Sequence, residues 1–511
     1  MSHLAVRAGR FPSIAETNTS VRHGAARLQT RSFVVPPSFP ARQFRKSAFQ
    51  ITARRAATRK SALLELSWRR TLTTTPSAGR KDGAREASTN ASPNPRYEAI
   101  VVGGGPAGIS AVGNLLEQKV APVLWVDPVF EAGRVNRCYR EVPSNTKVRL
   151  FIEFATATSP FRGIVTGKDL KEGDEAALKA LGRGDRLEFL RTLEQEKTCE
   201  LGTGADMLLL LSEGLRRESN VDAQNGRVAE ATFNDTSSTP NWTVRLSKDE
   251  HAATQPSITH AESPRLILCT GSSPNNSPLP ISIPGIADLD LDCALSPTLL
   301  STTLASQKET ATVAVIGASH SAVLVLRNLY NLASTQLPNL RIKWFTRHPI
   351  RYAEPQPDGW VLRENTGLKG EAATWARDSL EPDTMPHSDV SNYITKVAYD
   401  KGDEEGVFKQ HLSGCDWYVQ AIGYDRDPLP LLRMASSGKE VQPFFDHDNG
   451  YFKYADGKVE GDVGSLSRLP GLFGSGIAFP ERITDPHGNV EMNVGFWKFM
   501  KATKKWVEVW K

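Results

Sequence analysis

Short, continuous apolar runs recur along the chain, each followed by glycines and then by a longer stretch with helical spacing. Residues 97–102 form the first run, a glycine turn follows, and helical spacing continues to about Gln118. Residues 123–127 form the next run. Apolar runs of this length without polar alternation are typical of strands covered on both faces of a parallel sheet. The pattern predicts a βαβ unit over residues 97–127.

The same pattern returns further along the chain. An apolar run at residues 312–316 leads through Gly317 into a helix that we expect to end near Leu332, and residues 342–345 supply the returning strand. A βαβ unit with a glycine turn is the usual binding element for a dinucleotide. Two such units predict an α/β fold with two Rossmann-like dinucleotide-binding domains.

Weaker patterns lie between and after these units. Residues 205–217 have helical spacing, and residues 248–263 are polar enough for a long hairpin loop. The remaining apolar runs predict strands: a meander of residues 227–233, 242–246 and 265–269, a strand over residues 416–423 that re-enters the first domain, and a strand at residues 472–476 that ends in a glycine turn.

Positive charge is concentrated at the start of the chain. Residues 1–81 contain sixteen Lys and Arg but only two acids, a formal charge of +14; because the whole chain carries +5, the remainder carries −9. Arg, Ser, Ala and Thr dominate the same region, which is typical of a mitochondrial transit peptide; a disordered basic tail is the alternative. Because the body is acidic, we expect no nucleic acid as a partner.

Cysteine spacing and hydropathy argue against three further classes of protein: disulfide-rich, zinc-binding and membrane-spanning. The five cysteines include no Cys-x-x-Cys pair, so neither a disulfide framework nor a zinc site is supported, and we expect no metal. An uninterrupted apolar run of about 18 residues, which a membrane-spanning helix requires, does not occur in the sequence, so we expect no transmembrane segment.

The first glycine turn has the G-x-G-x-x-G spacing, directly after a predicted strand and at the start of a predicted helix. The first glycine permits the tight turn, the second lets a pyrophosphate approach the backbone, and the third lets helix and strand pack closely. Asp127 ends the next strand, where a ribose-binding acid is expected; a helix cap or surface acid is the alternative. The residues expected to bind a dinucleotide here are Gly103, Gly105, Pro106, Ala107, Gly108 and Asp127.

The second turn keeps Gly317 but has Ser319 and Ala322 where glycine is usual, and both residues can be accommodated. His320 opens the helix, where it either touches the nicotinamide cofactor or only lines the turn. Arg347 directly follows the returning strand, with Arg351 nearby. An arginine there can pair bidentately with a ribose 2′-phosphate, which favours NADPH over NADH; a solvated surface charge is the alternative.

The order of these segments resembles that of the two-dinucleotide-binding-domain flavoproteins, the superfamily that includes glutathione reductase-like enzymes and flavin-containing monooxygenases. The resemblance covers residue 97 to the C-terminus. It implies an NADP domain inserted into the FAD domain, a crossover between the domains at Gly271, and a segment along the flavin that contains Gly474 and Gly476. One departure is that Ile477 stands where the family usually has an acidic residue.

Residues near the expected flavin distinguish the branches of this superfamily. A disulfide reductase needs two close cysteines, and only Cys138 lies in the relevant stretch, where a small buried residue is the simpler interpretation. Residues 139–146 resemble the corresponding segment of flavin monooxygenases and N-hydroxylases. His487, Glu491 and Asn493 either face the flavin or substrate or serve the turn in which they lie.

Together these features predict an FAD-dependent, NADPH-using, monooxygenase-like oxidoreductase that acts on a small nucleophilic substrate and is imported into the mitochondrial matrix. A reductase that passes electrons to a protein or quinone, and a flavin-binding sensor without turnover, remain as alternatives. The expected segments are a transit peptide and linker at 1–92, the first part of the FAD-binding domain at 93–305, the NAD(P)H-binding domain at 306–415, and the second part of the FAD-binding domain at 416–511.

Overall fold

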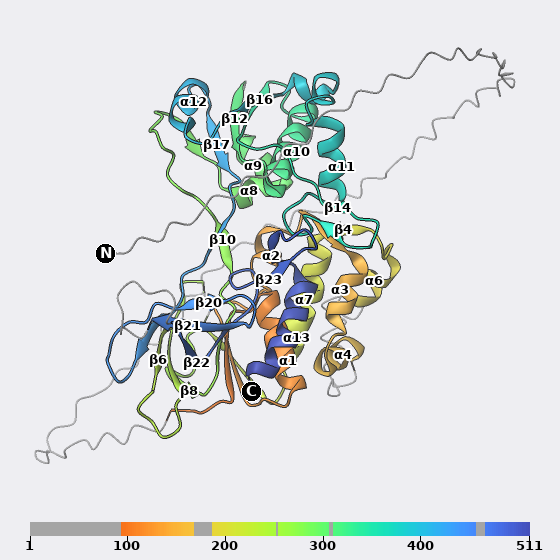
Figure 1. The fold of residues 1–511 in the computed structure, drawn as a ribbon. Helices are drawn as coiled ribbons and strands as arrows, with labels where there is room; N and C mark the ends of the chain where they lie inside the picture. Colours follow the sequence, from red (N-terminus) through yellow and green to blue (C-terminus); the bar gives the residue numbers. More distant parts are fainter. Residues whose placement is uncertain (1–93, 168–185, 252–253, 306–309, 456–465, 511) are drawn as a thin grey trace, which may run out of the picture. The chain divides into compact units, whose positions relative to one another are not determined.

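The computed structural model describes residues 94–167, 186–251, 254–305, 310–455 and 466–510 (Figure 1). The expected transit peptide lies outside the described residues. The described part contains one sheet that is mostly parallel and one that is wholly parallel, and each includes a βαβ unit with a helix between its two strands. This arrangement confirms the predicted α/β class with two Rossmann-like units.

The first βαβ unit lies in a seven-stranded sheet. Five neighbouring strands of this sheet run parallel, and an antiparallel ribbon continues it on one side. In order across the sheet the strands are β20 (Phe444–Asp446), β21 (Tyr451–Ala455), β22 (Leu466–Gly474), β9 (Leu266–Leu268), β1 (Ala99–Val102), β2 (Val123–Asp127) and β5 (Val221–Asn225).

Strand β1 is fully covered because its side chains alternate between two hydrophobic cores. Ala99 and Val101 pack into a core with helices on one face of the sheet. Ile100 and Val102 pack into a second core with strands of a four-stranded sheet. The helices of the first core include α1 (Pro106–Glu117), α3 (Val148–Ala155), α7 (Leu201–Leu215) and the C-terminal α13 (Phe496–Trp510), which lies alongside α1. The four-stranded sheet has the order β19 (Leu431–Met434), β6 (Arg227–Phe233), β7 (Trp242–Ser247) and β8 (His260–Ser263).

The second βαβ unit lies in a five-stranded sheet whose strands are all parallel. Its order is β11 (Ala287–Asp288), β17 (Trp417–Gln420), β12 (Ala311–Ile316), β13 (Leu340–Thr346) and β16 (Ile394–Ala398). Val313 and Val315 of β12 face one core and Ala314 and Ile316 face another, so this strand is also covered on both faces. Associated helices are α8 (Leu291–Leu295), α9 (Pro297–Leu304), α10 (His320–Thr335), α11 (Gly370–Ser379) and α12 (Glu404–His411) (Figure 1).

The remaining described elements are short. The other helices are α2 (Arg134–Cys138), α4 (Ser159–Thr166), α6 (Arg186–Thr192) and the 3₁₀ helices η1 (Met385–His387) and η2 (Asp389–Asn392). Four two-stranded pairs complete the fold: β3 (Pro143–Lys147) with β4 (Thr198–Glu200), β10 (Ser272–Pro274) with β18 (Tyr424–Arg426), β14 (Glu354–Pro355) with β15 (Val361–Leu362), and β23 (Glu481–Thr484) with β24 (Val490–Asn493). Helices long and apolar enough to cross a bilayer are absent from the part of the chain described.

Two strand assignments were wrong. The predicted third strand of the meander is β9, which pairs with β1 and β22 in the parallel sheet, whereas the meander is completed by β8 within the predicted loop 248–263. All three residues of β9 are apolar and buried, as a strand covered on both faces requires. Strand β17 pairs with β12, so the run at 416–423 does not re-enter the first sheet. The chain leaves the second sheet only after β17, through β18.

Candidate functional site

The first glycine turn is held together by contacts that exclude any side chain at two positions. Gly103 has a φ of +113°, and a Cβ on it would lie 2.2 Å from the carbonyl oxygen of Cys269. A Cβ on Gly108 would lie 1.8 Å from the carbonyl oxygen of Gly103. The indole N–H of Trp125, on β2, donates to that same carbonyl at 2.8 Å. Only glycine at both positions permits β1, β9 and α1 to meet this closely.

Gly105 differs from its neighbours because it leaves room. A Cβ added here would have as its nearest neighbour the Cα of Gly133, 3.9 Å away. Gly105 is the N-cap of α1 and supplies no side-chain cap, Pro106 is the first helical residue, and no acid lies in the first turn. The first amides of a helix carry partial positive charge and lack intrahelical partners. The start of α1, from Gly105 through Ala107, can therefore receive an anion.

Asp127 connects the turn to the loop after β2. One oxygen of its carboxylate accepts from the backbone N–H of Gly104 at 2.6 Å, and the other accepts from those of Val129 at 3.0 Å and Phe130 at 2.6 Å. These bonds fix the loop against the glycine turn. A carboxylate offers about four acceptor sites, so the three bonds leave capacity for a ribose hydroxyl. The ribose role of Asp127 stays a prediction.

The end of β22 reaches the first turn of α1. Gly476, with a φ of +97°, lies so close that a Cβ would be 2.5 Å from the Cβ of Ala107. A Cβ on Gly474 would meet the ring of Phe479 at 2.8 Å. Both glycines are buried, whereas the side chain of Ile477 is 40% exposed. The structure therefore places Gly476 against the start of α1, whereas Gly474 packs against Phe479, and their place along the flavin stays a prediction.

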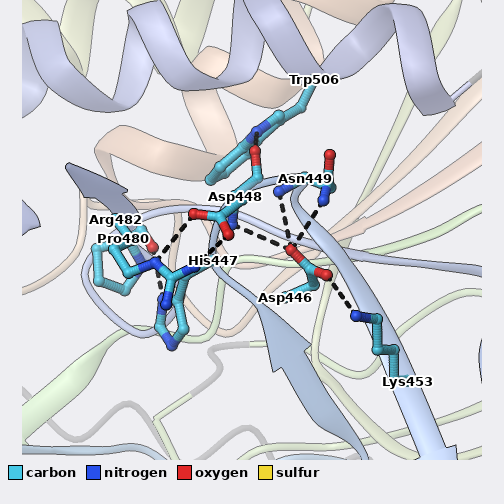
Figure 2. Close-up of polar contacts among 8 residues, drawn as sticks. All are labelled: Asp446, His447, Asp448, Asn449, Lys453, Pro480, Arg482 and Trp506. Carbon is cyan, nitrogen blue, oxygen red and sulfur yellow. Dashed lines mark hydrogen bonds and ion pairs between the residues drawn. The ribbon is translucent and has the colours of Figure 1, made fainter. Parts of the chain in front are cut away.

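Figure 2 shows the polar contacts that fix the chain beyond Gly476. Nδ1 of His447 lies 2.7 Å from the carbonyl oxygen of Pro480, so this nitrogen is the protonated one. Arg482 donates its backbone N–H to the carbonyl oxygen of His447 at 3.0 Å and forms an ion pair with Asp448. The indole N–H of Trp506, on α13, donates to the carbonyl oxygen of Asp448 at 3.2 Å. The turn between β20 and β21 thus ties the segment after Gly476 to α13.

Gly271 lies where β9 leads into the β10–β18 pair. Its φ is +87°, and its carbonyl oxygen accepts from the backbone N–H of Asp427 at 3.2 Å. Asp427 in turn accepts from the hydroxyl of Ser273 at 2.6 Å. The two segments that connect the first sheet with the second are therefore bonded to each other at Gly271.

Cys138 ends α2, beside an ion pair between Arg134 and Asp292 that joins α2 to α8. Burial and the carboxylate of Asp292 raise the pKa of the Cys138 thiol to about 11. A thiol that stays protonated at neutral pH is a poor nucleophile. This favours the interpretation of Cys138 as a small packed residue over that of a redox centre.

The second glycine turn repeats the construction of the first. Gly317 has a φ of +132°, and a Cβ on it would lie 2.4 Å from the carbonyl oxygen of Ala421. The indole N–H of Trp344, on β13, donates to the carbonyl of Gly317 at 2.8 Å. Ser319 is the N-cap of α10: its hydroxyl donates to the carbonyl of Ala421 at 3.0 Å and accepts from the N–H of Ala322 at 3.4 Å. The serine thus bonds the turn to the end of β17.

His320 is the first residue of α10. Its Nδ1 is buried and has no hydrogen-bond partner among the described residues. Burial, with a smaller effect from Lys369, lowers the pKa of His320 to about 4, so the ring is neutral at physiological pH. A neutral imidazole does not supply a positive charge to a phosphate. Its contact with the nicotinamide cofactor stays a prediction.

Arg347 follows β13 at its carboxyl end, as expected, but its side chain is not free. Its Nη1 donates to a carboxylate oxygen of Glu404 at 3.1 Å, and the arginine side chain is 39% exposed. Arg351 is exposed. The solvated-charge alternative and the 2′-phosphate role are both compatible with this position, so the latter stays a prediction.

The polar cluster near the C-terminus divides into different roles. His487 is exposed in the turn between β23 and β24, where Asp485 accepts its backbone N–H at 2.9 Å. Glu491 is buried and accepts from the hydroxyl of Thr366 at 2.5 Å and the backbone N–H of Asn365 at 3.0 Å. Asn493 is also buried, and its amide donates to a carboxylate oxygen of Glu481 at 3.2 Å. The His487 ring also packs edge-on against Trp360, with centroids 4.9 Å apart, Asn493 bonds within the β23–β24 pair, and Glu491 joins this pair to residues 365–366.

Several residues of these sites were missed. Gly133, with a φ of +66°, lies opposite Gly105, and Trp125 and Trp344 each bond the first glycine of a turn. The sequence did contain a signal for the tryptophans. Trp125 is the third residue of β2 and Trp344 is the fifth residue of β13, and both strands are otherwise rich in apolar residues. Glu404 gave no such signal, since it lies 57 residues from its partner Arg347.

Comparisons with known proteins bear on the family. No family model matches the sequence. The chain is 44% identical over 413 residues to Monooxygenase AgnR1 of Paecilomyces divaricatus, covering 81% of this chain and 97% of that protein. Among solved structures it is similar to L-lysine 6-monooxygenase from Pseudomonas syringae, with 14% identity, a TM-score of 0.46, and coverage of 81% of this chain and 98% of that one.

A second solved structure with this likeness is cyclohexanone monooxygenase from Rhodococcus sp. Phi1, with 13% identity, a TM-score of 0.45, and coverage of 81% of this chain and 84% of that one. Likenesses this remote do not identify a function. The identity to the fungal monooxygenase does identify a family, because it extends over nearly the whole of that protein. The chain therefore belongs to the same family as the monooxygenase AgnR1.

Proposed function

We propose that this protein is an FAD-dependent monooxygenase that uses NADPH to oxidise a small nucleophilic substrate. The observation that carries the proposal is the pair of glycine turns, built alike around Gly103 and Gly317. Family membership supports oxygen as the electron acceptor, in preference to a protein or quinone. FAD and NADPH would supply the redox chemistry of such an enzyme.

The residues at the first turn suit the pyrophosphate of FAD. The start of α1 has no side-chain cap and no acid in its first turn, and the space beside Gly105 is open. Gly133, on the facing loop, likewise presents backbone without a side chain. Amides and the helix dipole would stabilise the pyrophosphate there, and Asp127 would accept from the ribose.

The residues at the second turn suit a second dinucleotide, with less open space. The start of α10 also lacks an acid in its first turn, but Ser319 caps it. The neutral His320 would line the cofactor without adding a charge, and Arg347 would bind the 2′-phosphate. Bound at these two turns, FAD and NADPH would supply the hydride transfer and the chemistry with oxygen, and the protein's residues would orient the two cofactors and exclude water.

The proposal predicts the spectrum of the purified full-length protein. We expect it to be yellow, with flavin absorbance that bleaches on anaerobic addition of NADPH, because hydride passes to the bound flavin. Readmitting oxygen should restore the colour. Protein without flavin would refute the cofactor assignment. Rapid bleaching followed by reoxidation only with a quinone or protein acceptor would favour the reductase alternative, and flavin that NADPH does not bleach would favour the sensor.

We further infer that residues 1–92 direct import into the mitochondrial matrix. The support is the formal charge of +14 over residues 1–81 and the scarcity of acids there. Residues 1–92 fused to a fluorescent reporter should enter the matrix. A matched fusion in which Arg54, Arg55 and Arg59 are replaced by glutamine tests the charge and should be imported less. A diffuse cytosolic signal from the unaltered fusion would contradict the inference.

A further inference from the structure

The arginine expected to select NADPH is already bonded to an acid of the same domain. Arg347 follows β13, and Glu404 is the first residue of α12, which begins after the turn that leaves β16. The Nη1 of Arg347 lies 3.1 Å from Oε1 of Glu404. The other carboxylate oxygen accepts from the backbone N–H of Gly402 at 2.7 Å. Glu404 is therefore held in place from two sides.

Glu404 is ionised at neutral pH. Hydrogen bonds from its own backbone N–H and from that of Gly402, with a smaller contribution from Arg347, lower the pKa of its carboxyl group. Tyr399, whose backbone N–H donates to the carbonyl of Thr346 at 3.1 Å, interacts electrostatically with both Arg347 and Glu404. The guanidinium is thus in a small site that already contains one negative charge.

Glu404 occupies one of the five N–H donors of Arg347, so a bound phosphate would share the guanidinium with this carboxylate and would bring a second anion beside the first. Like charges at such distances repel, and solvent screens part of this repulsion because the side chains of Arg347 and Glu404 are 39% and 26% exposed. A ribose with a free 2′-hydroxyl meets no such repulsion, because a carboxylate can accept from the hydroxyl. We propose that Glu404 is a specificity-determining residue that competes with the 2′-phosphate of NADPH for Arg347 and thereby narrows the preference for NADPH over NADH.

This inference rests on the proposed NADPH site, and its test isolates the adenosine end of the cofactor. The probes are adenosine 2′,5′-bisphosphate and 5′-AMP, titrated calorimetrically into the full-length protein. Glu404→Gln removes the charge but keeps the size and the hydrogen-bond acceptor. It should lower the dissociation constant of the bisphosphate about three- to tenfold, in keeping with the energies of partly exposed ion pairs, and change that of 5′-AMP little.

Two further variants test whether the effect of Glu404→Gln is specific and whether it acts through Arg347. Glu405→Gln removes the same charge from the same turn of α12, at an exposed position, and should leave both affinities unchanged. In an Arg347→Ala background, Glu404→Gln should lose most of its selective effect on the affinity for the bisphosphate, because there is then no guanidinium for the carboxylate and the phosphate to compete for. This double-mutant comparison separates action through Arg347 from a general change of charge.

The outcomes separate the two proposals. If Glu404→Gln leaves the affinity for the bisphosphate unchanged or lowers it, then Glu404 orders Arg347 or caps α12. The inference is then wrong, while the proposed NADPH site stands. If Arg347→Ala lowers the affinity for the bisphosphate no more than it lowers the affinity for 5′-AMP, the assignment of the 2′-phosphate site itself is wrong. Equal tightening by Glu404→Gln and Glu405→Gln would also overturn the inference, because it would show only a long-range charge effect.

Discussion

Replacing Gly105 with glutamate is expected to abolish FAD binding while the protein still folds. The space next to Gly105 accepts a Cβ, with the nearest atom 3.9 Å away, so the new side chain has room to extend into the open space in front of α1. Its carboxylate would lie where the pyrophosphate is expected. Two like charges about 4 Å apart at an effective dielectric constant of about 20 repel by about 4 kcal/mol, roughly a thousandfold in affinity. The flavin-to-protein ratio, measured by absorbance after purification, should approach zero.

Neighbouring glycines distinguish a binding defect from a folding defect. Gly105→Ala should fold and retain some flavin, because it adds bulk without charge. Gly108→Ala should instead damage the fold, because its Cβ would lie 1.8 Å from a backbone oxygen. Gly406→Glu, on α12 with no atom within 4 Å of its Cβ, adds the same charge elsewhere and should leave flavin content unchanged. Stoichiometric flavin in Gly105→Glu would contradict the assignment of this turn.

Local pattern predicted the elements of the nucleotide sites well, because those elements are specified by near neighbours in sequence. Strand β2 spans the residues expected for it, and Gly103 and Gly317 both have the positive φ that their turns need. Strand partners were harder to predict. Strand β9 was assigned to the meander, yet it pairs with β1 and β22, from distant parts of the chain. Pairing depends on which faces of distant segments fit together, and an apolar run alone does not specify its partner.

The same limit applies to charges. Arg347 could be picked out as a candidate because it directly follows a predicted strand, a position defined locally. Its pairing with Glu404 depends on β16 lying beside β13, which brings the start of α12 to the end of β13. Likewise, the contact of Gly476 with Ala107 joins residues at opposite ends of the domain. Such contacts arise from the order of strands in the sheet, which spacing along the chain does not reveal.

Replacing Arg347 with alanine is expected to raise the Michaelis constant for NADPH strongly and to leave that for NADH nearly unchanged. A hydrogen bond to a charged group contributes roughly 1.5 to 3 kcal/mol, so the loss should be about ten- to over a hundredfold. Steady-state kinetics with both cofactors measure the effect.

Two arginines serve as comparisons for this variant. Arg351→Ala shows how much the neighbouring, exposed arginine contributes to the binding of NADPH. Arg341→Ala removes the same charge from the exposed, opposite end of β13 and should change neither Michaelis constant. If Arg347→Ala weakens both cofactors equally, Arg347 supports the fold or the part of the nucleotide that they share. If the native enzyme prefers NADH, the 2′-phosphate is not recognised at the end of β13, and the carboxylate of Glu404 would then be the group that receives the ribose.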